Sequence, residues 1–323
     1  MPAPPPAVLS RDIDRDGFRE MEVVGLRVEV PSNAPIVLLK EAHGGRYLPI
    51  WIGAVEATAI AFAQQGMISL RPLTHDLFRD VLEAVDIRLL SGRITSLVGG
   101  IFDGDLVLSN GSIVRSRPSD TIALAMRTGA PVLVSDEILA QVGCDLPDDP
   151  QAPQAGDPDR DKMQPGRTDE ARSAPGRDPT ALTMHEPRTA VMIELELVGV
   201  RVEMPSNRPI LLLKEMQGNR YLPIPIGRVE ATAIAFAQQG KVPAALLTHD
   251  LFRDVLDAVN IRLLSIGIVK LFEEIFYADL VLSNGGNVSS RTSDAVALAV
   301  RTGAKIEVAA EILNDVGVEP DED

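Results

Sequence analysis

One long segment of this chain is present twice, and this duplication constrains the fold more than any other feature. When the chain is aligned with itself at an offset of 174 residues, Val24 falls on Val198 and Gly143 falls on Gly317 without a gap. Roughly two thirds of the positions in between are identical, and the copies far exceed solenoid units of about 20 to 50 residues. At about 125 residues, each copy is close to the commonest domain size and can bury its own core.

The sequence outside the two copies is poor in large apolar side chains. Residues 1–20 begin with a proline-rich run, and residues 148–190 are rich in Pro, Asp, Arg and Gly. Such segments cannot bury enough apolar surface to offset the entropy lost on ordering. We therefore predict the following organisation: a disordered N-terminal segment (1–20), domain 1 (21–147), a disordered linker (148–190), domain 2 (191–318) and an acidic tail (319–323).

The charge balance argues against one class of nucleic-acid binder. The formal net charge is −15, and about a third of this excess lies in the two end segments, so the domains are only mildly acidic. Neither domain carries the basic field of a tight, non-specific nucleic-acid binder. Aromatic residues make up 4% of the chain, which also disfavours a base-stacking platform. A nucleic-acid substrate would therefore need a local basic site or a metal.

Cysteine content and hydropathy indicate the cellular environment. The single Cys144 permits no internal disulfide, which is typical of a reducing compartment. No apolar N-terminal segment and no run long enough to cross a membrane is evident. We expect a cytoplasmic protein that does not contact membranes.

The first part of each copy has the pattern of three strands and two helices. Residues 24–31 alternate apolar and charged side chains, which indicates a strand with one face in water. Two more strands flank the turn signal Gly44-Gly45. An alanine-rich helix then begins near Glu56, and a second helix begins at Thr74 with apolar side chains at helical spacing.

The second part of each copy returns to strands. Strand patterns at 87–97 and 102–108 lead into Asn110-Gly111, the strongest short hairpin signal. A third helix begins after Arg117 and ends at Gly129, and a short strand and a helical turn complete the copy. We predict an α+β fold built from a duplicated domain, each copy having a mixed β-sheet packed by about three helices.

Two of the four histidines occupy the same place in the two copies, within Thr74-His75-Asp76 and Thr248-His249-Asp250. Threonine is a preferred N-cap and an acid in the first turn complements the helix dipole, so helix formation alone explains both residues. Histidine gains nothing from that dipole. In a functional interpretation it is a general acid or base, or a metal ligand, beside a helix N-terminus that favours phosphate. A structural histidine is the alternative.

The third helix of each copy begins after an arginine, in Arg117-Pro118-Ser119-Asp120 and Arg291-Thr292-Ser293-Asp294. Serine suits a helix cap and aspartate suits the first turn, but a cation is unfavourable there unless an anion shares the place. An arginine with free helix N–H groups would make a phosphate clamp. A structural Arg–Asp ion pair is an equally good interpretation.

Glutamates begin the alanine-rich helices at Glu56 and Glu230, where they stabilise the helix dipole by default. They become site candidates only if the fold brings them near His75 or Arg117. The chain has no Cys/His zinc spacing, P-loop, dinucleotide fingerprint or nucleophile elbow, and no acid cluster with two-metal spacing. Spacing alone therefore predicts a duplicated α+β domain with a candidate anion site.

Several motifs together carry a resemblance to a known family. In the first copy they are Arg46–Gly53, Glu56-Ala57, Arg71–Leu77 and Arg117–Ala125. In the second copy they are Arg220–Ile224 with Gly227, Glu230-Ala231, Thr248–Leu251, Phe276–Ala278 and Ser293-Asp294. Each copy resembles the bifunctional nuclease (BFN) domain over essentially its whole length.

The resemblance implies an α+β fold and hydrolysis of phosphodiester bonds, because DNase and RNase activity is attributed to some members of that family. Nucleic acid is then the expected substrate. The catalytic candidates are the histidines His75 and His249, with the acids Glu56, Asp76, Asp120, Glu230, Asp250 and Asp294. The candidate phosphate-binding residues are Arg71, Arg117, Ser119, Arg291 and Ser293. The cofactor is left open, with a divalent metal as one option.

The second copy departs from the motif pattern at a few places. It has Ala245-Leu246 where the first copy has Arg71-Pro72, and Thr292 where the first copy has Pro118. Loss of the arginine at that place is expected to weaken anion binding. We therefore expect the first copy to be nearer the family pattern around the second helix.

A function of a different class competes with the nuclease. The mildly acidic domains, the few aromatic residues and the missing catalytic motifs also suit a non-enzymatic regulatory module that binds an anion or a nucleotide. In either case we expect the two copies to pair within the chain as a pseudo-dimer, with homo-oligomerisation left open. A flexible linker of this length could span such a pairing.

Overall fold

The computed structural model describes residues 16–67, 72–145, 191–240 and 246–319. The strands of the first copy are β1 (Phe18–Glu29), β2 (Ala34–Glu41), β3 (Arg46–Trp51), β4 (Leu89–Val98), β5 (Ile101–Leu108), β6 (Ile113–Ser116), β7 (Val132–Ser135) and β8 (Cys144–Asp145). Its helices are α1 (Ala54–Gln64), α2 (Thr74–Ala84), α3 (Pro118–Thr128) and α4 (Asp136–Val142).

The second copy repeats this order of elements up to its last helix, and at the place of β8 its described residues form only an isolated bridge between Tyr221 and Val318. Its strands are β9 (Met192–Glu203), β10 (Arg208–Glu215), β11 (Tyr221–Pro225), β12 (Leu263–Phe272), β13 (Ile275–Leu282), β14 (Asn287–Arg291) and β15 (Lys305–Ala309). Its helices are α5 (Arg228–Gln238), α6 (Thr248–Ala258), α7 (Thr292–Thr302) and α8 (Ala310–Val316).

Each copy forms one mixed sheet. The strand order is β6-β5-β4-β7-β1-β2-β3-β8 in the first copy and β11-β10-β9-β15-β12-β13-β14 in the second. The antiparallel hairpins are interrupted once in each sheet, where β4 pairs with β7 and β12 pairs with β15 in parallel. This parallel pair arises because helix α3, or α7, carries the chain across the sheet between the last hairpin strand and the next one.

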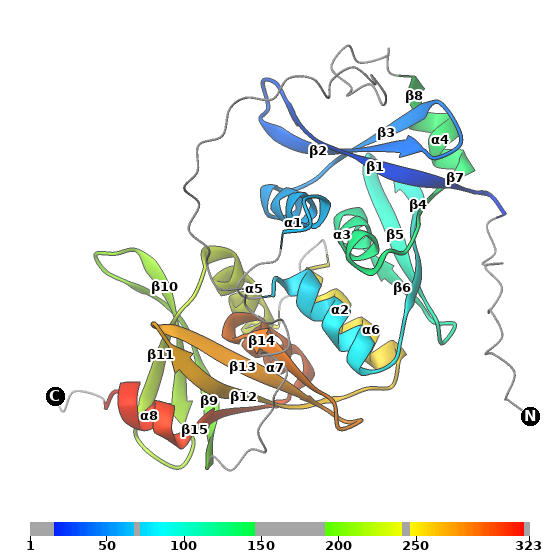
Figure 1. Cartoon of the computed structure of the whole chain (residues 1–323). Helices are drawn as coiled ribbons and strands as arrows, with labels where there is room; N and C mark the ends of the chain where they lie inside the picture. The colour runs from blue at the N-terminus through cyan, green and yellow to red at the C-terminus, as the bar shows by residue number, and fades with distance from the viewer. Residues whose placement is uncertain (1–15, 68–71, 146–190, 241–245, 320–323) are drawn as a thin grey trace, which may run out of the picture. The chain divides into compact units, whose positions relative to one another are not determined.

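The crossover helix α3 is the most deeply packed helix of the first copy. Its residues 119–125 are all buried, and it ends at Gly129, whose φ of 70° is left-handed and suits a residue without a β-carbon. Figure 1 shows α3 beside α1, with both helices against the first sheet. Among the helices in the described ranges, none is long and apolar enough to cross a membrane.

Helices α2 and α6 join the cores of the two copies. The ring of Phe78 stacks on the ring of Phe252, with centroids 4.2 Å apart and planes 4° apart, and both rings are fully buried. One continuous hydrophobic cluster runs from α2 and the β5–β6 hairpin into the core of the second copy. A separate cluster of buried residues in the first copy lies around β1–β3, α1 and α3. Stacked aromatic rings add to the apolar burial at this contact.

The predicted α+β fold with a mixed sheet in each copy is confirmed. One boundary differs, because β1 begins at Phe18, inside the segment 1–20 that was expected to be disordered. Residues 18–21 pair with β7, so backbone hydrogen bonding to the sheet orders them. The predicted linker, residues 148–190, lies outside the described residues.

Candidate functional site

The start of helix α2 differs from the sequence expectation. Thr74 is the first helical residue and not the N-cap, which is Leu73. The carboxylate of Asp76 accepts a hydrogen bond from the Leu73 backbone N–H at 2.9 Å, so the acid stabilises the helix start. The same carboxylate accepts from Arg127 Nε at 2.7 Å. The Thr74 hydroxyl is thus released from capping and reaches the other copy.

Asp120 is the centre of the first polar cluster. Its Oδ1 accepts from His75 Nε2 at 2.8 Å and from the Thr248 hydroxyl of the second copy at 2.9 Å. Its Oδ2 accepts from Arg117 Nε at 2.8 Å. Asp120 is 1% exposed and His75 is 5% exposed. A buried carboxylate with three donors is stable in its ionised form.

The electrostatics of Asp120 follow from these contacts. Burial alone would raise the pKa of its carboxyl, but the hydrogen bond from His75 and the charge of Arg117 hold that pKa well below its ordinary value of 3.8. An ionised carboxylate can only accept hydrogen bonds, so His75 Nε2 carries the hydrogen. The other ring nitrogen, Nδ1, is the one that remains for proton exchange.

The side-chain partners of Arg117 explain why a cation lies at the N-terminus of α3. Besides Asp120, its guanidinium donates to Glu56 Oε1 at 3.0 Å and to the Thr248 hydroxyl at 3.0 Å. A cation at the N-terminus of α3 is offset by two carboxylates, which removes the dipole penalty. The ion-pair interpretation of this arginine therefore describes the geometry, and a phosphate would have to share the guanidinium with these carboxylates.

The second copy repeats the cluster with the roles of the copies exchanged. Asp294 accepts from His249 Nε2 at 2.8 Å, from Arg291 Nε at 2.6 Å and from the Thr74 hydroxyl at 3.0 Å. Arg291 also donates to Glu230 at 3.2 Å and to Thr74 at 3.1 Å. Each threonine therefore serves the histidine–aspartate pair of the opposite copy. As for Asp120, burial opposes ionisation while the histidine and arginine hold the pKa of Asp294 below its ordinary value.

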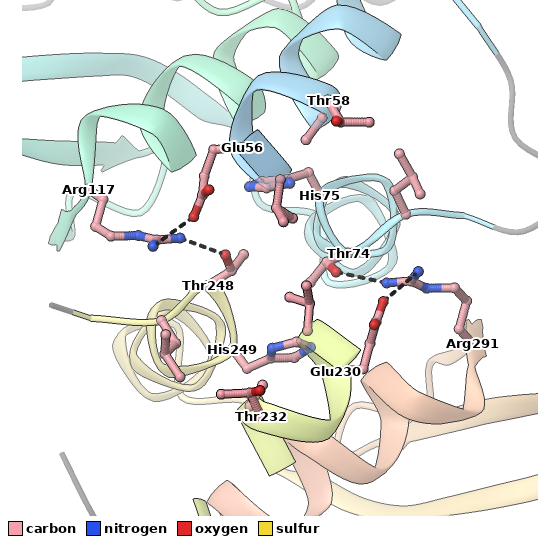
Figure 2. Close-up of a pocket in the computed structure, with 16 residues that line it drawn as sticks. Glu56, Thr58, Thr74, His75, Arg117, Glu230, Thr232, Thr248, His249 and Arg291 are labelled. Carbon is pink, nitrogen blue, oxygen red and sulfur yellow. Dashed lines mark hydrogen bonds and ion pairs between the residues drawn. The ribbon is translucent and has the colours of Figure 1, made fainter. Parts of the chain in front are cut away.

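One pocket of about 510 Å³ brings the two clusters together. Figure 2 shows the Glu56–Arg117–Thr248 and Glu230–Arg291–Thr74 contacts facing each other across it. Both histidines line the pocket, as do the starts of α1, α2, α5 and α6. The residues that line it are Val55, Glu56, Thr58, Ala59, Leu73, Thr74, His75 and Arg117 with Val229, Glu230, Thr232, Ala233, Leu247, Thr248, His249 and Arg291.

Negative charges outnumber positive charges around the pocket. Arg117 and Arg291 face four carboxylates, so the group carries two net negative charges when both histidines are neutral. Within the described part of the chain, no group of three or more His, Cys, Asp or Glu side chains is placed to hold a metal ion. Glu56 and Glu230 are the carboxylates at the pocket wall that could contact a cation.

The remaining predicted site residues lie elsewhere. Asp76 and Asp250 accept hydrogen bonds from Arg127 and Arg301, and neither aspartate lines the pocket. Ser119 and Ser293 are the second residues of α3 and α7, and neither is among the residues that line this pocket in the described ranges. Arg71 lies outside the described residues.

Sequence reasoning missed two features of the site. The sequence pattern of Thr74 and Thr248 predicts helix caps, and nothing local distinguishes a capping threonine from one whose hydroxyl contacts the other copy. Arg127 and Arg301 were not singled out, although each is retained at the end of its helix in both copies. The identity of this arginine in the two copies was the available signal.

The family model of the bifunctional nuclease domain matches residues 37–147 and 211–321. The chain belongs to the bifunctional nuclease domain family. Both matched segments contain a complete histidine, arginine and acid set, so the predicted tandem pair of BFN domains is confirmed.

Two relatives match this chain over one region. Two uncharacterised proteins of Mycobacterium tuberculosis, from strains CDC 1551 / Oshkosh and ATCC 25618 / H37Rv, are each 51% identical over 130 residues. The matched region covers 40% of this chain and 79% of each relative. Its length is that of one BFN copy.

Proposed function

We propose that this chain is a nuclease that hydrolyses phosphodiester bonds of DNA or RNA in the pocket shared by its two copies. The observation that carries the proposal is that two histidines, each held by a buried aspartate, line one pocket. The helix starts of α2 and α6 also face this pocket and favour a phosphate there. Membership of the family supports the same reaction class.

The reaction uses one histidine as base and the other as acid. Asp120 holds the Nε2–H of His75, which leaves Nδ1 to take a proton from the attacking water. As the water oxygen bonds to phosphorus, the leaving oxygen takes a proton from His249, which Asp294 supports in its charged form. The pseudo-symmetry of the pocket allows either histidine to fill either role.

This mechanism requires that the negative charge of the substrate phosphate be offset at the pocket. A phosphodiester enters a group that already carries two net negative charges when the histidines are neutral. Like charges repel strongly in a partly buried site. Protonation of a histidine or entry of a divalent cation with the substrate would offset this repulsion, so activity should respond to added magnesium or to a chelator.

The test compares hydrolysis of end-labelled single- and double-stranded DNA and RNA by wild type and by the His75→Ala/His249→Ala double variant, with and without chelator. The double variant should lose activity by about 10²- to 10⁴-fold, the usual contribution of general acid–base catalysis. His43→Ala is the matched control because His43 is exposed in the β2–β3 turn. Equal activity in wild type and double variant would remove the histidines from the mechanism.

A regulatory binding module is the second candidate function. It is favoured by one observation, that the arginines at the pocket are already bound to carboxylates and threonines and so behave as a structural network. In that case a nucleotide would raise the melting temperature of the protein without being hydrolysed. A thermal-shift measurement run beside the hydrolysis assay separates the two functions.

A further inference from the structure

A second pocket, of about 470 Å³, lies in the C-terminal copy behind Arg291. Its walls come from the start of β10, the end of β11, the turn between β12 and β13 and the first residues of α7. Arg291 and Glu230 line both pockets, so the Arg291–Glu230 ion pair forms a wall between them. Thr292 and Ser293, the first two residues of α7, also line the second pocket, so the N-terminus of this helix faces it.

The strongest sign of a ligand here is a buried hydroxyl without a partner. Thr292, the first residue of α7, lines the pocket and is 3% exposed, and its Oγ1 has no hydrogen-bond partner. Leaving a buried hydroxyl unsatisfied costs about 1 to 3 kcal/mol, so such a group calls for an explanation. Helix α7 has eleven residues, and no side chain caps its N-terminus. Its first N–H groups and the hydroxyl together form a site for an acceptor-rich anion.

Two unneutralised charges line the same pocket. Arg208 and Glu274 are both exposed, and neither side chain forms a hydrogen bond or ion pair with any residue that the structure describes. They also do not pair with each other, although they have opposite charge. Arg208 supplies planar N–H donors for a phosphate. Glu274 supplies an acceptor for a hydroxyl or an amine.

The first copy serves as an internal reference, because it lacks these groups. Alignment of the copies places Ala34 at the position of Arg208, and Pro118 at the position of Thr292. Proline has neither the hydroxyl nor the backbone N–H. The copies are identical at about two thirds of their positions. Two polar residues that replace apolar ones at a single pocket therefore point to a property specific to the second copy.

The β12–β13 turn also carries charged side chains that the first copy lacks. Glu273 and Glu274 have left-handed φ angles of 49° and 62°, where the first copy has Gly99 and Gly100 at 59° and 82°. A side chain at such a φ costs about 1 to 2 kcal/mol that glycine avoids. The second copy thus carries a carboxylate at the pocket in spite of backbone strain, which is common at ligand sites.

We propose that this pocket of the C-terminal copy binds a nucleotide, with its phosphate on Thr292, the first N–H groups of α7 and Arg208. The sugar hydroxyls or base amine of the nucleotide face Glu274. A pocket of this volume suits a small ligand of that size. The phosphate comes either from a free nucleotide or from a nucleic-acid strand that also occupies the first pocket. The proposal concerns binding and holds whether or not the chain hydrolyses its ligand.

The experiment measures binding of inorganic phosphate, adenosine 5′-monophosphate and a short single-stranded oligonucleotide by calorimetry on the full chain. Thr292→Val and Arg208→Ala should each weaken phosphate and nucleotide binding by about tenfold or more, the usual value of a hydrogen bond to a charged group. Thr292→Val removes an unpaired hydroxyl, so its melting temperature should equal or exceed that of wild type. Arg262→Ala, an exposed arginine of the same copy outside the pocket, is the control.

Glu274→Gly, which restores the residue of the first copy, provides a second readout. It should tighten inorganic phosphate binding and reduce the preference for the nucleotide over phosphate, because the acceptor is lost and the negative charge removed. If oligonucleotide binding falls in Arg208→Ala together with nucleotide binding, the phosphate comes from a strand. If only nucleotide binding falls, the ligand is a free nucleotide.

All titrations are repeated in the His75→Ala/His249→Ala background, so that a failure of hydrolysis does not obscure the binding result. The proposal is overturned if neither phosphate nor nucleotide binds to the folded wild type. It is equally overturned if Thr292→Val and Arg208→Ala bind both ligands as tightly as wild type does.

Discussion

At the scale of single residues, Asp120 and Asp294 organise the site. Each carboxylate accepts from a histidine and an arginine of its own copy and from a threonine of the other copy. In the sequence both look like ordinary first-turn acids, and the dipole argument accounts for them fully. Both aspartates also bind a histidine, because α3 and α7 pack beside the starts of α2 and α6. No local sequence pattern encodes that packing.

The depressed pKa of Asp120 makes a prediction about pH. Because the folded pKa lies below the ordinary value of 3.8, ionised Asp120 contributes its stability at neutral pH, and this contribution is lost as the pH falls below about 4. Urea unfolding of wild type between pH 7 and pH 3 should show a steep loss of stability at the acid end. Asp120→Asn should be less stable at pH 7 and should lose less on acidification, and Asp294→Asn should behave alike. A wild-type pH dependence that both variants retain in full would contradict this account.

At the scale of elements, the helix periodicity and the turn signals were sufficient to predict most of each copy. The alanine-rich helix, the helix at Thr74, the Asn110-Gly111 hairpin and the glycine end of α3 lie where the sequence placed them. Local patterns could not predict which side chain links helices α1, α2 and α3 by hydrogen bonds. Arg127 does this, because it donates to Asp76 on α2 at 2.7 Å and to the Ala59 carbonyl on α1 at 3.0 Å.

Arg127→Lys is therefore expected to destabilise the first copy although it keeps the charge. The Arg127 side chain is 4% exposed, and an ammonium group cannot replace a planar guanidinium that donates in two directions. We expect a loss of about 2 to 3 kcal/mol in the free energy of unfolding, measured by urea denaturation. Arg79→Lys is the control, since Arg79 pairs with Asp80 at the surface and should change stability by less than about 0.5 kcal/mol. Equal effects of the two substitutions would show that Arg127 does not tie the helices.

At the scale of the whole molecule, the pairing of the two copies makes the pocket. Each threonine completes the cluster of the opposite copy, and Phe78 stacks on Phe252 within one continuous hydrophobic cluster. We propose that the copies unfold as a unit. In this proposal the copies are coupled by shared apolar burial as well as by shared hydrogen bonds.

Phe252→Ala tests this coupling, because the only tryptophan of the chain, Trp51, lies in the first copy. Truncation of a fully buried phenylalanine costs about 3 to 5 kcal/mol. The tryptophan fluorescence transition of the first copy should shift to lower urea together with the circular dichroism transition of the whole chain. Phe272→Ala, which removes an exposed phenylalanine of the second copy, should leave both transitions in place. A fluorescence transition that stays unmoved in Phe252→Ala would mean that the copies unfold separately.

The sequence by itself determined that the protein is a duplicated α+β domain, where most of its strands and helices lie, and to which family it belongs. These properties rest on periodicity, turn chemistry and repetition, which are local or can be read by aligning the chain with itself. Only the tertiary structure decided that His75 meets Asp120, that Arg117 is bound to Glu56, and that Thr74 serves the opposite copy. Those contacts join residues far apart in the sequence, and their geometry follows from how the sheets, helices and copies pack.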